Sequence, residues 1–111
     1  MYKIYGIKNC STMQKAFAHL DAQGLSYEFI DYKKQKPTRA DLERWKAGFG
    51  DWPVNKQGTT YRKLKEHYEA ASDSQQADLL TQNPSAIKRP ILEGEGLLLK
   101  GFEAEQWPSK A

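Results

Sequence analysis

The chain has 111 residues, 39% of them hydrophobic, and a net charge of +3, which suffices for one compact domain with one core. Its sequence has no apolar run of the roughly 18 to 20 residues that a membrane helix needs, no secretory signal pattern at the N-terminus, and no dense basic face of the kind typical of nucleic-acid partners. We therefore expect a cytoplasmic, monomeric protein that binds neither membranes nor nucleic acid directly.

The first third of the chain predicts a strand, a helix and a second strand. Residues 3–7 alternate as a short strand does, and residues 27–32 form the second strand. Between them, the segment from Ser11 to Gln14 predicts a capping box, and a helix then runs to a stop at Gly24. Its apolar residues recur at helical spacing: Met13, Ala16, Phe17 and Leu20. This order predicts a βαβ unit with two parallel strands.

The segment from about residue 34 to residue 88 changes character and is predicted to be helical. Thr38 caps the first helix, with Asp41 near the positive end of its dipole. A second helix begins near Gly58, and a third begins at Ser72 or Ser74. A short turn follows at Asn83–Pro84. We interpret this segment as a helical insertion within a single domain that covers residues 1–111.

The last part of the chain returns to β-structure. Residues 91–93 and 97–100 predict a hairpin joined by a three-residue turn from Gly94 to Gly96. Residues 103–107 are predicted to form a short final helix before Pro108. The complete order is βαβ, helical insertion, ββα, which indicates an α/β fold with a mixed sheet.

Cys10 is the single cysteine of the sequence, which excludes an intrachain disulfide and a metal site of several thiolates. It lies where a strand leads into a helix, so backbone N–H groups and the helix dipole favour its thiolate. Thiols at such positions have pKa values of roughly 3.5 to 7.5. A buried structural cysteine is the alternative, but the polar neighbours in residues 8–12 favour a reactive thiol. His19 and His67 lack ligand spacing and are predicted to be surface helix residues, and no bound metal or cofactor is expected.

Arg89 and Pro90 form the second candidate pair. Arginine is always charged and can bind an oxyanion through two parallel hydrogen bonds. Proline restricts the preceding residue to an extended conformation, so Arg89 is predicted at the mouth of the strand that begins at Ile91. In a βαβ–ββα arrangement this strand lies beside the first one. A surface arginine without a functional role is an equally good interpretation of the residues alone.

Three sequence blocks occur in one order along nearly the whole chain: Tyr5 to Thr12, Gly58 to Leu64, and Asn83–Pro84 followed by Ile87 to Leu92. Together they resemble the glutaredoxin-linked, ArsC-like arsenate reductase family, most closely its YffB branch, and Spx-type regulators are similar too. The resemblance implies a thioredoxin-like fold with a helical insertion, which agrees with the predicted order of elements. It also implies a cis peptide bond before Pro90.

The resemblance further implies that Cys10 is the nucleophile and that Arg89 binds an oxyanion or stabilises the thiolate. Arsenate reductases of this type use two further arginines. This chain has Asn55, followed by a lysine, at the first of these positions and Lys100 at about the second. Arg62 resembles the YffB branch and can supply replacement charge. Weak or absent arsenate reduction is therefore expected.

The first functional hypothesis is a thiol-dependent oxidoreductase. Cys10 attacks and forms a mixed disulfide with glutathione, the expected co-substrate, or with a glutaredoxin-like thiol. Thr12 and the backbone N–H groups of residues 11–13 would stabilise negative charge near the sulfur. Arg89 would hold an anionic partner. The substrate-binding residues are expected to be Thr12, Asn55, Arg62, Pro90 and Lys100.

The second hypothesis is a non-enzymatic module that binds RNA polymerase, as Spx-type regulators do. In that case the exposed residues of the helical insertion would matter more than Cys10. The Cys-x-x-Cys switch often found in those regulators is absent here, because Met13 occupies its second position. Replacement of Cys10 would abolish the first function and can spare the second.

Overall fold

The computed structural model describes residues 1–109, which divide into two compact units. The sheet unit consists of Met1–Lys34 together with the chain from Arg89 onward, and the helical unit is Gln35–Lys88. The insertion expected from the sequence spanned about residues 34–88, so its bounds differ from those of the helical unit by one residue. That the two units form a single domain stays a prediction.

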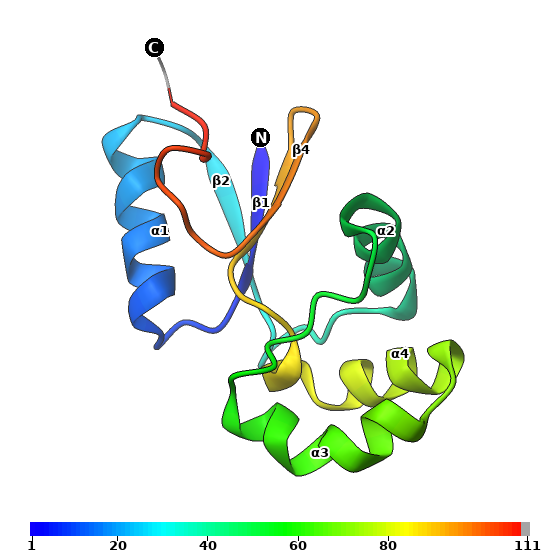
Figure 1. Ribbon diagram of the computed structural model, residues 1–111. Helices are drawn as coiled ribbons and strands as arrows, with labels where there is room; N and C mark the ends of the chain where they lie inside the picture. The colour runs from blue at the N-terminus through cyan, green and yellow to red at the C-terminus, as the bar shows by residue number, and fades with distance from the viewer. Residues whose placement is uncertain (110–111) are drawn as a thin grey trace. The chain divides into compact units, whose positions relative to one another are not determined.

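The sheet unit contains four strands and one helix (Figure 1). The strands are β1 (Tyr2–Gly6), β2 (Tyr27–Asp31), β3 (Ile91–Gly94) and β4 (Leu97–Lys100), and α1 (Ser11–Ala22) connects β1 to β2. They are ordered β2-β1-β3-β4 in one sheet. β1 pairs parallel with β2, while β3 pairs antiparallel with both β1 and β4. The predicted βαβ unit and mixed α/β sheet are confirmed.

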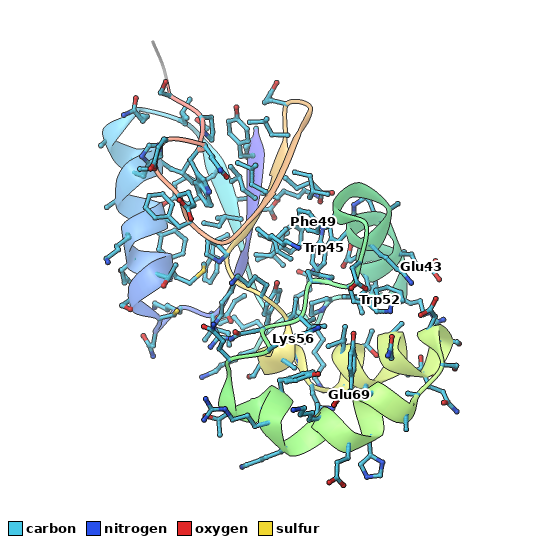
Figure 2. The ribbon with its side chains drawn as sticks, in the orientation of Figure 1. Glu43, Trp45, Phe49, Trp52, Lys56 and Glu69 are labelled. Atoms are coloured by element: carbon cyan, nitrogen blue, oxygen red, sulfur yellow. The ribbon has the colours of Figure 1, made fainter. Side chains whose placement is uncertain are left out.

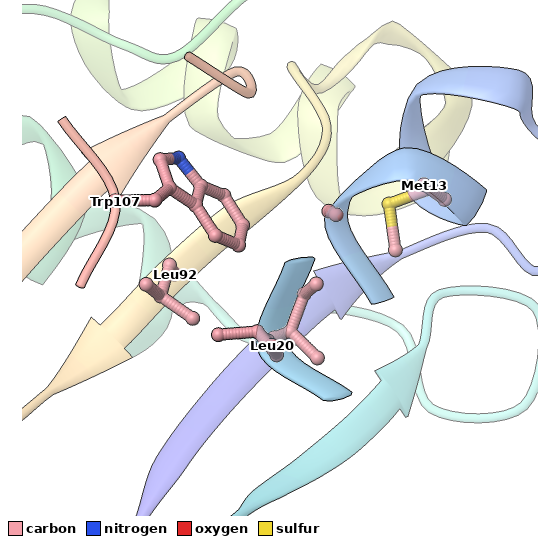
Figure 3. Packing of buried hydrophobic residues seen from close by; sticks show 6 residues of the cluster. Met13, Leu20, Leu92 and Trp107 are labelled. Atoms are coloured by element: carbon pink, nitrogen blue, oxygen red, sulfur yellow. The ribbon is translucent and has the colours of Figure 1, made fainter. Parts of the chain in front are cut away.

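A single apolar cluster joins α1 to the sheet. Met13, Ala16 and Leu20 form the buried stripe of the helix, as their spacing predicts. They pack with Ile4 of β1, Leu92 of β3 and Trp107 from the C-terminal segment, and Figure 3 shows this cluster. All six side chains are almost completely removed from solvent. Because Met13 lies in the first turn of α1, this packing holds the beginning of the helix against the strands.

The β3–β4 hairpin is confirmed, but its turn is shorter than predicted. Gly94 pairs with Leu97 in the sheet register, so Glu95 and Gly96 alone form the loop. Both have positive φ angles, 50° and 78°, which suits a two-residue hairpin turn whose twist matches that of the strands. Gly94 belongs to β3 instead of the turn because its backbone remains in register.

The final helix predicted for residues 103–107 is wrong. Residues 104–106 form one turn, in which the backbone N–H groups of Gln106 and Trp107 donate to Glu103 O. Trp107 is buried, and its indole N–H donates to Gly101 O at 3.1 Å. His19 lies in α1, as predicted, but its ring is half-buried against Phe102 and Trp107 and its Nε2 lies 2.9 Å from Pro108 O. Because Trp107 is buried against α1, residues 103–107 form a turn here and not a regular helix.

The helical unit contains α2 (Arg39–Phe49), α3 (Thr59–Ala70), α4 (Asp73–Gln82) and the short 3-10 helix η1 (Pro84–Ala86). Thr38 caps α2 and Asp41 lies in its first turn, as predicted, and the two residues together form a capping box. Ser72, one of the two predicted candidates, caps α4 with Gln75. Each capping residue satisfies backbone N–H groups that have no partner inside the helix.

Within residues 1–109, none of the helices has both the length and the apolar character that crossing a membrane would require.

Candidate active site

Cys10 is the residue immediately before α1. Its backbone is extended (φ −133°, ψ 130°), and its carbonyl accepts the first hydrogen bond of the helix from Gln14 N at 3.0 Å. Cys10 itself is therefore the N-cap. The capping box predicted from Ser11 to Gln14 is wrong, because the helix begins one residue earlier than that pattern requires. Gln14 instead donates its side-chain amide to Lys8 O at 2.8 Å, which closes the loop that carries Cys10.

The surroundings of the Cys10 thiol favour its ionised form. Partial burial alone would raise the pKa of this thiol, but the Met13 backbone N–H, the Arg89 side chain and the Thr12 backbone N–H outweigh burial, so the pKa is lowered. Thr12 and Met13 are the second and third helical residues, whose N–H groups point toward an N-cap side chain. The thiol makes no capping hydrogen bond of standard geometry at the start of the helix.

Arg89 reaches this thiol because of the strand pairing. Tyr5 of β1 is paired with Ile91 of β3, so the chain that enters β3 passes the end of β1 from which Cys10 follows. The peptide bond between Arg89 and Pro90 is cis, as the family resemblance implied. The Pro90 carbonyl accepts a hydrogen bond from Gly101 N at 2.8 Å. This bond fixes the backbone directly after Arg89.

Gly6 was not identified from the sequence, although it shapes this site. A Cβ atom on residue 6 would collide with the thioether of Met13, 2.7 Å from its Cε, and would lie 3.4 Å from Arg89 Cβ. Glycine at this position leaves the Met13 thioether in its place, because a Cβ atom would force that side chain to shift. A glycine at the end of a strand, four residues before a candidate nucleophile, is the one sequence signal that could have indicated this role.

The structure brings together Cys10, Thr12 and Arg89 of the predicted site residues. Lys100 is an exposed residue at the end of β4, paired in register with Ile91. Asn55 and Arg62 belong to the helical unit. The backbone N–H of Asn55 donates to Ala86 O and its carbonyl accepts from Gly58 N, while Arg62 is an exposed residue of α3. Binding roles for Asn55, Arg62, Pro90 and Lys100 stay predictions.

Comparison with known proteins identifies relatives along the whole described chain. A model of the ArsC family matches residues 5–109. The solved structure of a YffB protein has a TM-score of 0.84 and 43% sequence identity, covering 96% of this chain and 95% of that one. An uncharacterized protein of Haemophilus influenzae is 36% identical over 109 residues, 96% of either chain. An arsenate reductase of Rhizobium meliloti is 27% identical over 92 residues, which covers 80% of this chain and 66% of that enzyme.

These matches confirm the resemblance to ArsC-like and YffB proteins, and they confirm the thioredoxin-like fold expected from it. The matched region contains the end of β1, the loop with Cys10, the helical unit and the β3–β4 hairpin. The chain belongs to the ArsC family.

Proposed function

We propose that this protein is a thiol-dependent oxidoreductase whose nucleophile is Cys10. One observation carries the proposal: the thiol lies at the N-cap of α1, where two backbone N–H groups and Arg89 lower its pKa despite partial burial. The thiolate is the reactive form of cysteine. Relatives that are named arsenate reductases support thiol chemistry in this family.

The reaction is a thiol–disulfide exchange. The Cys10 thiolate attacks one sulfur of oxidised glutathione, the disulfide bond of that molecule breaks, and one glutathione thiolate leaves with the electron pair. The product is a mixed disulfide between Cys10 and glutathione. Cys10 is the single cysteine of the chain, so it cannot be regenerated through an internal disulfide. A second external thiol, such as glutathione or a glutaredoxin-like protein, attacks the mixed disulfide and releases the Cys10 thiolate.

Glutathione suits this site because of its charge. It carries two carboxylates, and arginine binds carboxylates through charge-assisted hydrogen bonds. Arg89 supplies one such donor beside the thiol, and Lys100, which belongs to the same unit, is a further candidate for binding the partner. The exchange needs no bound cofactor, because both electrons move between sulfur atoms.

The test is the intact mass of the protein after incubation with oxidised glutathione. We expect one glutathione on the native chain, none on Cys10→Ser, and slower addition and removal on Arg89→Ala. Lys15→Ala is the matched control, since it removes the same charge from an exposed position on α1. An unmodified native chain whose Cys10 reacts only after denaturation would mean that the cysteine is structural. Binding of RNA polymerase by native protein and by Cys10→Ser alike would then favour the regulator hypothesis.

A further inference from the structure

Two cavities of the helical unit share Trp52 in their walls but differ in how their charged side chains are paired. The larger, with a volume of about 540 Å³, lies along α2 and the beginning of α4. Its cations are already engaged: Arg39 pairs with Asp78 at 2.9 Å, and Lys46 pairs with Asp73 at 3.0 Å and lies over the Trp52 ring. These pairs connect the two helices, so this cavity has no charge left for a ligand.

The smaller cavity has a volume of about 310 Å³ and a mixed charge. Lys56 comes from the segment before α3, Glu69 comes from α3, and Asp51 comes from the segment after α2. Figure 2 labels Lys56 and Glu69 together with Trp52. Within residues 1–109, neither the Lys56 ammonium nor the Glu69 carboxylate forms an ion pair, although both line this cavity. Opposite charges that face one cavity without neutralising each other can bind opposite ends of one ligand.

The wall of the smaller cavity is aromatic. The Tyr61 and Tyr68 rings meet edge to face with centroids 5.5 Å apart, and both rings are buried, as is Trp52. Burial, and then the negative charge of Asp51, raise the pKa of the Tyr68 hydroxyl, and a tyrosine hydroxyl is in any case a hydrogen-bond donor at neutral pH. Aromatic faces next to carboxylates attract organic ammonium groups through cation–π and Coulomb interactions.

Trp52 provides an independent observation. Its side chain is 93% buried, and its indole N–H has no hydrogen-bond partner in the part of the chain that the structure describes. A buried donor without a partner is costly, and such donors are uncommon in folded proteins. Trp52 lines the smaller cavity, so a ligand bound there would lie beside this ring and change the surroundings of its indole N–H.

We infer that the smaller cavity binds a small zwitterion, namely a free α-amino acid. Its ammonium group lies against Asp51, Glu69 and the aromatic wall, and its carboxylate meets Lys56. The volume is at the lower end of the roughly 300 to 1,000 Å³ typical of ligand sites, which suits a molecule of this size. Cys10 takes no part in this binding.

The test uses the indole N–H resonances of the three tryptophans in a ¹⁵N-correlated NMR spectrum of the whole protein. The Trp52 signal is assigned with Trp52→Phe. Each standard L-amino acid is added up to about 20 mM, because a small ligand with few contacts is expected to bind with a dissociation constant in the millimolar to micromolar range. We expect at least one amino acid to shift the Trp52 resonance saturably and to leave that of Trp107 unchanged. If none does so, the inference is wrong.

Two pairs of matched variants locate the bound groups. Lys56→Met and Glu69→Gln should each weaken binding about ten- to a hundredfold, since each removes a charge-assisted contact. Lys65→Met and Glu66→Gln alter exposed residues of α3 that do not line the cavity, and they should bind normally. Acetate and ethylamine test the two ends of the ligand separately. If either one alone binds as tightly as the amino acid, the zwitterion assignment is wrong.

Discussion

The backbone of Gly6 lies so close to the thioether of Met13 that a Cβ atom on residue 6 would force the Met13 side chain to shift. A Cβ atom there would stand 2.7 Å from Met13 Cε and 3.4 Å from Arg89 Cβ. Met13 donates its backbone N–H toward the Cys10 thiolate, and Arg89 donates its side chain. One glycine at the end of β1 therefore leaves room for side-chain atoms of both residues that stabilise the thiolate.

Gly6→Ala is expected to disturb this arrangement and raise the pKa of Cys10. Overpacking of a buried site typically costs about 1 to 3 kcal/mol of stability, and displacement of Met13 or Arg89 weakens the stabilisation of the thiolate. Iodoacetamide alkylation against pH measures the pKa, and urea unfolding measures the stability. Gly96→Ala is the control, because residue 96 has a positive φ but open space around it. This variant should lose stability without a change in alkylation, and equal alkylation curves for both variants would contradict the role of Gly6.

Arg89→Ala is expected to raise the midpoint of Cys10 alkylation, because the hydrogen bond and the positive charge of Arg89 both lower the pKa of this thiol. The Met13 and Thr12 backbone N–H groups remain in the variant and continue to lower the pKa. Lys15→Ala should leave the midpoint nearly unchanged. A native midpoint at or above that of a free thiol would show that the thiolate is not stabilised. An unchanged midpoint in Arg89→Ala would assign the whole effect to the end of the helix.

The lowered pKa of Cys10 also predicts how the free energy of unfolding depends on pH. Between the folded and the unfolded pKa of this thiol, the unfolded chain binds more protons than the folded one, so stability rises with pH. The contribution is fully present above the unfolded pKa and is lost as the pH falls through the folded pKa. The free energy of unfolding, measured with urea from about pH 6 to about pH 9, should rise with pH more steeply for native protein than for Cys10→Ser. Parallel curves would contradict the lowered pKa.

Arsenate reduction should be weak or absent. Arg89 is present, but Asn55 and Lys100 stand where the family resemblance leads us to expect two further arginines. A charge-assisted hydrogen bond contributes roughly 1.5 to 3 kcal/mol, so the loss of two lowers transition-state binding by about two to four orders of magnitude. Lys56, Arg62 and Lys100 can recover part of this loss. Turnover of arsenate with glutathione and glutaredoxin is the measurement, and a rapid rate would refute the argument.

Trp107→Ala is expected to destabilise the sheet unit strongly. Trp107 packs on the cluster that contains Met13 and Leu92 (Figure 3), and its indole N–H is bonded to Gly101 O. Truncation of a buried tryptophan typically costs about 3 to 5 kcal/mol. Trp107→Phe keeps much of the ring and should cost less. Urea unfolding measures the stability lost in each variant. If both variants lose the same stability, the effect is due to the hydrogen bond and not to the packing of the ring.

The amino-acid sequence by itself determined the features that depend on neighbouring residues. Alternation in β1 and β2 and the apolar spacing of α1 predict the βαβ unit, and the position of Cys10 between strand and helix follows from them. The capping boxes at Thr38 and Ser72 are also local, since each involves a residue only three positions further along. Hydrogen bonds over such short separations can be predicted from the sequence, although the Ser11–Gln14 pattern shows that the actual start of a helix can differ from the local signal.

Tertiary structure decided the features that depend on distant residues. Three features differ from the local sequence pattern: the start of α1 at Ser11, the two-residue hairpin turn and the missing final helix. Strand register determines the hairpin turn, and burial of Trp107 replaces the final helix. The contact of Arg89 with Cys10 requires β1 and β3 to be paired, and the close approach of Gly6 to Met13 requires α1 to be packed on the sheet. The mixed-charge cavity likewise gathers residues from three separate segments. Sequence spacing carries no information about such contacts, because long-range packing of apolar surface brings them together.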